Sequence, residues 1–68
     1  MNADQWLRTF AEELGVDPPD EETSGLLLDL AATAAHNSER IAAPLACYMT
    51  GLSGKSPEEA RQAAERVG

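Results

Sequence analysis

Residues 41–52, IAAPLACYMTGL, carry no charged side chain and decide the predicted fold class. Alanine and leucine favour helices, and β-branched residues are scarce along the whole chain, so strands are improbable. Pro44 is compatible with a helix that begins near residue 41, because the amide that proline lacks would have no partner in the first turn. We therefore predict a helix over 41–52, and its broad apolar face is typical of a central element. The face consists of Ile41, Leu45, Tyr48 and Leu52, widened by Ala42, Ala46 and Met49.

Local start and stop signals predict three more helices. Asn2 and Gln5 are spaced as a capping box, and Gly15 stands where a left-handed residue ends a helix. Between them, apolar residues recur at the spacing of one helix face. These residues are Leu7, Phe10, Ala11 and Leu14.

The other two helices begin at equally clear signals. Pro18 and Pro19 interrupt the first helix, and Asp20 can then cap a second one. Ser56, followed by a proline and by Glu59 three residues later, is a strong start signal for the last helix. The predicted helices are therefore 3–14, 21–37, 41–52 and 57–67.

These elements predict an all-α fold, a compact bundle of four short helices that forms a single domain over residues 1–68. The second and third helices should form the hydrophobic centre, with the first and fourth packed around them. A chain of this length buries a modest share of its surface, so a partner or self-association is plausible. We expect a monomer or a weak homodimer.

Composition excludes several classes of protein. The net charge of −7 and the absence of a basic cluster argue against nucleic acid as a partner. Cys47 is the only cysteine, so neither an internal disulfide nor a four-ligand structural zinc site is expected, and we predict no cofactor. The mostly apolar stretch 25–35 is too short to span a bilayer, and the first residues lack a basic leader segment. We therefore expect a soluble, cytoplasmic protein that does not associate with membranes.

A stripe of polar residues crosses the otherwise apolar second helix and runs on past its end. The stripe occupies one side of a helix, provided that the helix stays regular as far as residue 40. One interpretation is an ordinary solvated face. The other is a recognition patch in which His36 and Arg40 present donors to a carboxylate or a phosphate. The stripe consists of Asp29, Thr33, His36, Asn37 and Arg40.

The reactive and aromatic side chains have simpler interpretations. Cys47 and His36 fall on different predicted helices, so we expect no nucleophile and base pair and no enzyme. Cys47 is predicted to be a small interior residue. Trp6 and Phe10, four residues apart, are predicted to pack in the core, with an exposed aromatic anchor as the alternative, and Tyr48 is predicted to lie in the core or at its rim.

The segment 35–51, AHNSERIAAPLACYMTG, resembles a small bacterial domain family of unassigned function. That family occurs alone or at the C-terminus of proteins similar to the nucleotidyltransferase that makes molybdopterin guanine dinucleotide. The chain departs from the family at Asn37 and Ile41, where members often have Gly and Pro, and near Ala46 and Cys47, where they have Thr. The resemblance implies a link to maturation of the molybdenum cofactor and no particular reaction. The matching positions are His36, Arg40, Pro44, Leu45, Tyr48 and Gly51.

Two functional hypotheses follow from the stripe and the resemblance together. The first is a non-enzymatic accessory or protein-interaction module that binds a molybdenum-cofactor nucleotidyltransferase or a molybdoenzyme maturation protein through the surface around His36, Asn37 and Arg40, with Asp29 and Thr33 beside it. The second is a small-molecule binder that holds an anionic, phosphate-bearing pterin or nucleotide between His36, Arg40 and Lys55.

Overall fold

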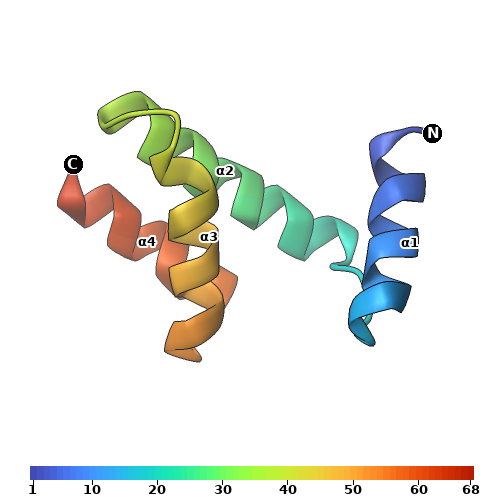
Figure 1. The fold of residues 1–68 in the computed structure, drawn as a ribbon. Helices are drawn as coiled ribbons and strands as arrows, with labels where there is room; N and C mark the ends of the chain where they lie inside the picture. Colours follow the sequence, from blue (N-terminus) through green and yellow to red (C-terminus); the bar gives the residue numbers. More distant parts are fainter.

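The structure is a computed structural model that describes all residues, 1–68, and it contains four α-helices and no strand (Figure 1). This confirms the all-α fold and the bounds predicted for the first, second and fourth helices. The third helix begins and ends one residue later than predicted. The helices are α1 (Ala3–Leu14), α2 (Glu21–Asn37), α3 (Ala42–Ser53) and α4 (Pro57–Val67).

Capping contacts explain why α1 and α4 begin where they do. The Asn2 side chain accepts a hydrogen bond from the Gln5 amide, and the Gln5 side chain accepts one from the Asn2 amide, both at 2.9 Å. Ser56 and Glu59 make the same reciprocal pair at 3.1 and 2.9 Å. Gly15 ends α1 with a φ of 74°, a left-handed conformation that glycine adopts without a steric penalty. Both predicted capping boxes are therefore confirmed.

The two central helices begin differently. The carboxylate of Asp20 accepts a hydrogen bond from the Thr23 amide at 2.8 Å, so Asp20 caps α2 as predicted. Ile41 precedes α3 without any side-chain cap, and Pro44 lies in the first turn of that helix. At that position the missing proline amide leaves no intrahelical hydrogen bond broken.

The helices pack as a three-helix body with one helix apart. The long helix α2 packs against both α3 and α4, whereas α1 lies beyond the N-terminal end of α2 and packs extensively against no other helix (Figure 1). The prediction that the first helix packs around the centre is therefore wrong. The physical reason lies in the linker 15–20, because Pro18 and Pro19 hold extended backbone and carry the chain away from α1.

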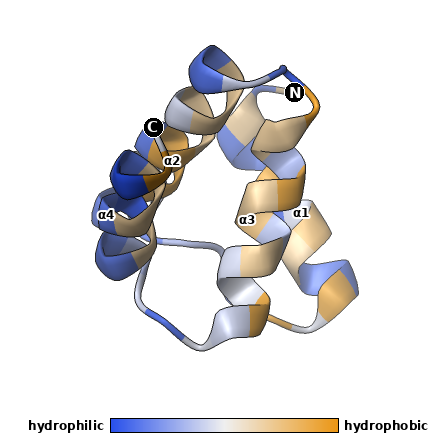
Figure 2. Ribbon diagram, turned by 90° about the vertical axis from the view of Figure 1, so that its left-hand side faces the viewer, coloured by the Kyte–Doolittle hydropathy of each residue, from blue (hydrophilic) through white to orange (hydrophobic).

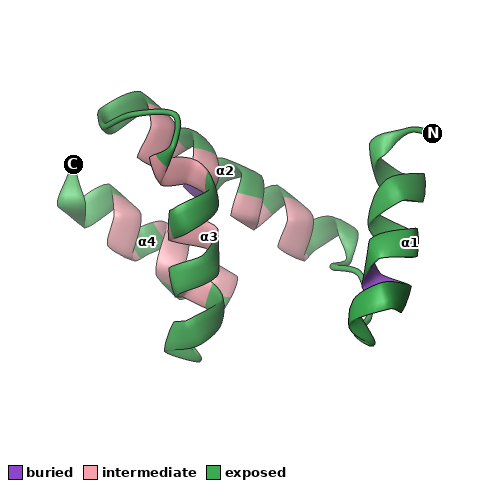
Figure 3. Cartoon of the chain, viewed as in Figure 1, coloured by how far each residue is buried: buried purple, intermediate pink, exposed green.

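Burial is low along the whole chain. Only Ala11 and Leu30 are fully buried, one near the C-terminal end of α1 and one in α2 (Figure 3). Half-buried residues concentrate where α2, α3 and α4 meet, and nearly all of α1 is exposed (Figure 3). The packed centre of the molecule therefore belongs to the three-helix body.

The orientation of α3 reverses the prediction made from its apolar face. Small residues at helical spacing, including Ala42, Ala46 and Thr50, are half-buried, whereas Leu45 and Tyr48 are 59% and 67% exposed. In Figure 2 the upper part of the α3 ribbon has mostly hydrophobic colours. Helices with small side chains at their contact approach more closely. The contact with α2 therefore uses the small side chains of α3 and leaves the large ones outside.

Candidate interaction surface

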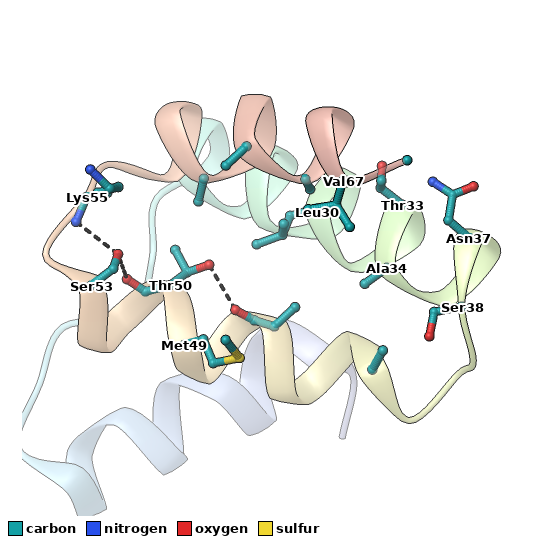
Figure 4. Close-up of a pocket in the computed structure, with 16 residues that line it drawn as sticks. Leu30, Thr33, Ala34, Asn37, Ser38, Met49, Thr50, Ser53, Lys55 and Val67 are labelled. Carbon is teal, nitrogen blue, oxygen red and sulfur yellow. Dashed lines mark hydrogen bonds between the residues drawn. The ribbon is translucent and has the colours of Figure 1, made fainter.

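An open groove runs between α3 and α4, with α2 as its floor (Figure 4). Its volume is about 440 Å³, and small or apolar residues line most of it. Leu30, the one buried residue of α2, belongs to its floor. The apolar lining consists of Leu30, Ala34, Ala42, Ala46, Met49, Ala60, Ala63, Ala64 and Val67.

Polar residues mark the two ends of the groove. Thr33, Asn37 and Ser38 lie at the end formed by the last turns of α2, and Ser53 and Lys55 lie at the opposite end (Figure 4). The groove therefore has an apolar middle with hydrogen-bonding groups at both ends, a combination typical of sites that orient a partly apolar ligand.

Local hydrogen bonds occupy much of the polar end near α4. The Ser53 hydroxyl donates to the Thr50 carbonyl at 2.8 Å and accepts from the Lys55 amide at 3.1 Å. The Thr50 hydroxyl donates to the Ala46 carbonyl at 2.9 Å. The Lys55 ammonium forms no ion pair, so it is the free cation at this end.

A second, smaller hollow, called here the polar hollow, lies beside the groove and is lined by most of the predicted polar stripe. Asp29, Thr33, His36 and Asn37 line this hollow together with residues of α4. The sequence therefore indicated correctly that these four side chains share one side of α2. The fifth member of the stripe lies elsewhere.

Arg40 is separated from the other members because α2 ends before it. The helix ends at Asn37, and Ser38 has a φ of −142° and a ψ of −110°, which are not helical values. Arg40 lies in the exposed turn that leads to α3. The assumption of a regular helix as far as residue 40 is therefore wrong, and His36 and Arg40 do not share a helix face.

The arginine that lines the hollow is Arg61 of α4, whereas the predicted stripe had contained Arg40. Its guanidinium lies 2.7 Å from Glu58 and 2.6 Å from Glu65. The hydrogen bond from Arg61 lowers the pKa of Glu58, and the pKa of Arg61 is raised mainly by its hydrogen bond to Glu58, then by the charges of Glu58, Glu65 and Asp29. The cation of the hollow is therefore already neutralised by its own helix.

Arg61 was not among the predicted site residues, although part of the signal for it is present in the sequence. Glu58 and Glu65 stand three and four residues from Arg61, a spacing that predicts ion pairs on one helix. Nothing in the sequence shows that α4 lies against the Asp29 side of α2. That proximity follows from the packing of α4 on α2.

The three side chains proposed to hold an anionic ligand are not brought together. His36 lines the polar hollow, Lys55 lies at one end of the groove, and Arg40 lies in the turn between α2 and α3. Asn37, at the α2 end of the groove, is far from Lys55 in Figure 4. A clamp of His36, Arg40 and Lys55 around one phosphate is therefore not formed.

The aromatic and thiol side chains differ from their predicted places. Trp6 and Phe10 stack on each other with their ring centroids 4.9 Å apart, but they are 52% and 44% exposed. Their predicted core position is therefore wrong, and the pair is exposed, as the alternative of an aromatic anchor requires. Tyr48 is exposed, and Cys47 is half-buried rather than fully interior.

Two further observations bear on the chemistry of the surface. No three His, Cys, Asp or Glu side chains lie together in a way that could hold a metal ion. No helix combines the length and the apolar character needed to cross a bilayer.

The whole chain, residues 1–68, matches the family described as a domain of unknown function, DUF6457. The chain belongs to this family. No curated protein and no solved structure matches it. The family assignment therefore covers the detached helix α1 as well as the three-helix body.

Proposed function

We propose that this chain is a non-enzymatic protein-interaction module whose groove binds an amphipathic helix of a partner protein. The observation that supports this proposal is the open groove of about 440 Å³ between α3 and α4. Bundles bury their apolar faces with a fourth helix, and here α1 does not occupy that place. A partner helix that lays its apolar face in the groove would complete the arrangement.

Charge indicates the polar face of that partner helix. The chain has a net charge of −7, although the residues that α4 contributes to the groove itself are small or apolar. Complementary charge steers association and selects partners. We therefore propose a partner helix with lysine or arginine on its polar side.

The resemblance of segment 35–51 supports a physiological partner. The domain family that it resembles occurs with the nucleotidyltransferase that makes molybdopterin guanine dinucleotide. We propose that this nucleotidyltransferase, or a protein that matures molybdoenzymes, supplies the helix. Arg40 and His36 would then act as separate contacts at the edge of the complex, because they do not share a helix face.

Two titrations test the proposal. The first uses an amphipathic helical peptide with leucines on one side and lysines on the other, and the second uses the nucleotidyltransferase itself. Amide chemical shifts should change at Ala46, Thr50 and Ala63, which line the groove, and a scrambled peptide of the same composition should leave them unchanged. Shifts spread evenly over the surface, or equal binding of the scrambled peptide, would contradict a groove that recognises a helix.

A matched pair of variants separates groove binding from general charge effects. Val67→Lys places a positive charge at an exposed position that lines the groove, and Leu28→Lys places the same charge at an exposed position outside it. Calorimetry should show the affinity for the peptide and for the nucleotidyltransferase falling by about tenfold or more in Val67→Lys, since charged groups are costly in an interface core. Leu28→Lys should bind nearly as the wild type does.

A second candidate function is binding of a small anionic ligand, and one observation favours it. The groove falls within the usual volume range of ligand pockets, about 300 to 1,000 Å³, and Lys55 stands unpaired at one of its ends. A phosphate-bearing pterin or nucleotide would place its ring against the alanines and its phosphate near Lys55. Titration with pterin phosphates or GDP should then shift amides near Lys55, and the response should disappear in Lys55→Gln.

A further inference from the structure

Two apolar helix faces outside the groove are left largely uncovered by the rest of the chain, although Ala11 beside the first of them is buried. The first, called here the α1 face, consists of Trp6, Leu7, Phe10 and Leu14, all of them exposed. The second, called here the α3 outer face, consists of Ile41, Leu45, Tyr48 and Leu52, which are also exposed. Hydrophobic residues colour stretches of both helices in Figure 2. Contiguous exposed apolar surface of this kind marks an interaction site.

The chain exposes more surface than a folded monomer of its size. A monomer of 7.2 kDa is expected to expose about 4,100 Å², whereas this chain exposes 5357 Å². Its radius of gyration is 12.4 Å, against about 11 Å for a compact chain of this length. For two copies together, the exposed area above the expected value is about 2,500 Å², which falls in the size range of stable homodimer interfaces. Association of two copies could therefore remove the surplus that the single chain shows.

The linker between α1 and α2 favours contact with a second copy over closure onto the same chain. Pro18 and Pro19 restrict the backbone of this linker to extended conformations. A linker that holds an apolar helix away from its own body is the arrangement from which identical chains exchange elements. The α1 face is therefore presented outward, where another copy can reach it.

The two faces fit each other in length and in charge. Both α1 and α3 have 12 residues, so each is about 18 Å long. α1 carries Asp4, Glu12 and Glu13 against the single cation Arg8, so it is net acidic and the carboxylates of α4 would repel it. α3 carries no charged residue, so the acidic helix can lie on it without like-charge contact.

We propose that two copies of this chain form a two-fold symmetric dimer in which the α1 face of each copy packs on the α3 outer face of the other. The symmetry makes the two contacts identical, as expected for an isologous interface. The groove between α3 and α4 is not part of this contact. Dimer formation is thus separate from the proposed binding of a partner helix.

Sedimentation of the purified chain between about 1 μM and about 1 mM tests the dimer. The wild type should shift from monomer to dimer across this range. Leu45→Glu should weaken the dimer at least about tenfold, because a carboxylate would be buried in the apolar contact. Leu28→Glu is the matched control, since Leu28 is another exposed leucine outside both faces, and it should dimerise as the wild type does.

Phe10→Glu supplies a second variant outside the three-helix body, because Phe10 is an exposed residue of α1, which packs extensively against no other helix. It should also weaken the dimer, with unchanged helix content by circular dichroism. A wild type that stays monomeric throughout the range, or a Phe10→Glu variant that dimerises as the wild type does, would overturn the proposal.

Mixing the two variants tests the exchanged arrangement itself. A heterodimer of Phe10→Glu and Leu45→Glu restores one contact in which both the α1 face and the α3 outer face are intact. The mixture should therefore dimerise more strongly than either variant alone. If like faces packed together instead, α1 on α1 and α3 on α3, no rescue would occur, and that result would overturn the proposed arrangement.

The outcomes also separate this proposal from the proposed function. A monomeric wild type that still binds the lysine-bearing helical peptide in its groove would overturn only the dimer. A dimer that dissociates in Leu45→Glu and binds no peptide would overturn only the interaction module.

Discussion

Ser56 is the N-cap residue of α4 and stands at the end of the loop that follows α3. Its hydroxyl accepts the Glu59 amide, and its own amide donates to the Glu59 side chain. Only two residues of the chain are fully buried, so few core contacts fix the helices and the capping hydrogen bonds matter more for their stability. Individual capping residues are therefore the positions at which single substitutions should be felt.

Ser56→Ala should lower the free energy of unfolding by about 1 kcal/mol, because the Glu59 amide loses its partner. Urea unfolding followed by circular dichroism measures the change. Ser38→Ala is the control, since the Ser38 side chain makes no hydrogen bond in the structure and should cost little. Equal losses in the two variants would show that the cap contributes no specific stability.

Asp20 makes the stability of α2 depend on pH. The backbone hydrogen bond from Thr23, and then the Thr23 side chain, lower the pKa of Asp20 below its ordinary value of 3.8. A carboxyl group with a lowered pKa in the folded chain contributes stability that is present above its ordinary pKa and is lost as the pH falls through the folded value. The effect therefore belongs to the acid range, below about pH 4.

Asp20→Asn should make the loss of stability below about pH 4 shallower, because asparagine still caps the helix but does not titrate. Urea unfolding at a series of pH values from acid to neutral measures the slope. Asp17→Asn is the control, because it removes the same charge from an exposed position outside the helices, and its slope should stay as in the wild type. An unchanged slope in Asp20→Asn would contradict the proposed contribution of the cap.

Helix α3 packs one face against the body of the molecule and leaves another apolar face exposed. Its small residues Ala42, Ala46 and Thr50 lie toward the body, and its large residues lie outside. The helix ends at Ser53 and is capped by Gly54, whose φ is 72°, whereas Gly51 lies inside the helix with open space around its Cα. Gly54 therefore needs the backbone freedom of glycine, whereas Gly51 does not.

Gly54→Ala should destabilise the chain by about 1 kcal/mol, because an alanine in the left-handed region is strained. Gly51→Ala should instead stabilise it by about 0.5 to 1 kcal/mol, since alanine is the better helix former. Thermal unfolding of the two variants side by side measures the difference. Changes of the same sign would contradict the C-terminal boundary of α3.

The whole chain combines a large apolar surface with a net charge of −7. Like charges on two copies repel each other, while burial of the apolar faces attracts them. Salt screens the repulsion between exposed charges and leaves the apolar contribution in place. Association of this chain should therefore be stronger at high salt.

The melting temperature of the wild type should rise with protein concentration and with added NaCl, because a dimer stabilises the folded chain by mass action. Leu45→Glu should show little dependence on concentration. Differential scanning calorimetry at two concentrations and two salt levels measures both effects. A wild-type melting temperature independent of concentration would contradict self-association.

Local signals along the chain predicted most of the helices and their ends. Asn2, Asp20 and Ser56 cap the helices that they were expected to cap, and Gly15 ends α1 as expected. These contacts join residues only a few positions apart, so neighbouring side chains and the backbone suffice to define them. The same holds for the four stripe residues of the polar hollow, since all four belong to one helix.

The packing of the helices, in contrast, is decided by contacts between residues far apart along the chain. Periodicity marked the apolar face of α3 but could not show that its alanines, rather than Leu45 and Tyr48, would face α2. It also could not show that α1 stands apart, or that Arg61 lies beside Asp29. An apolar pattern records that a surface avoids water, and only the tertiary structure shows which surface of the chain, or of another molecule, is available to cover it.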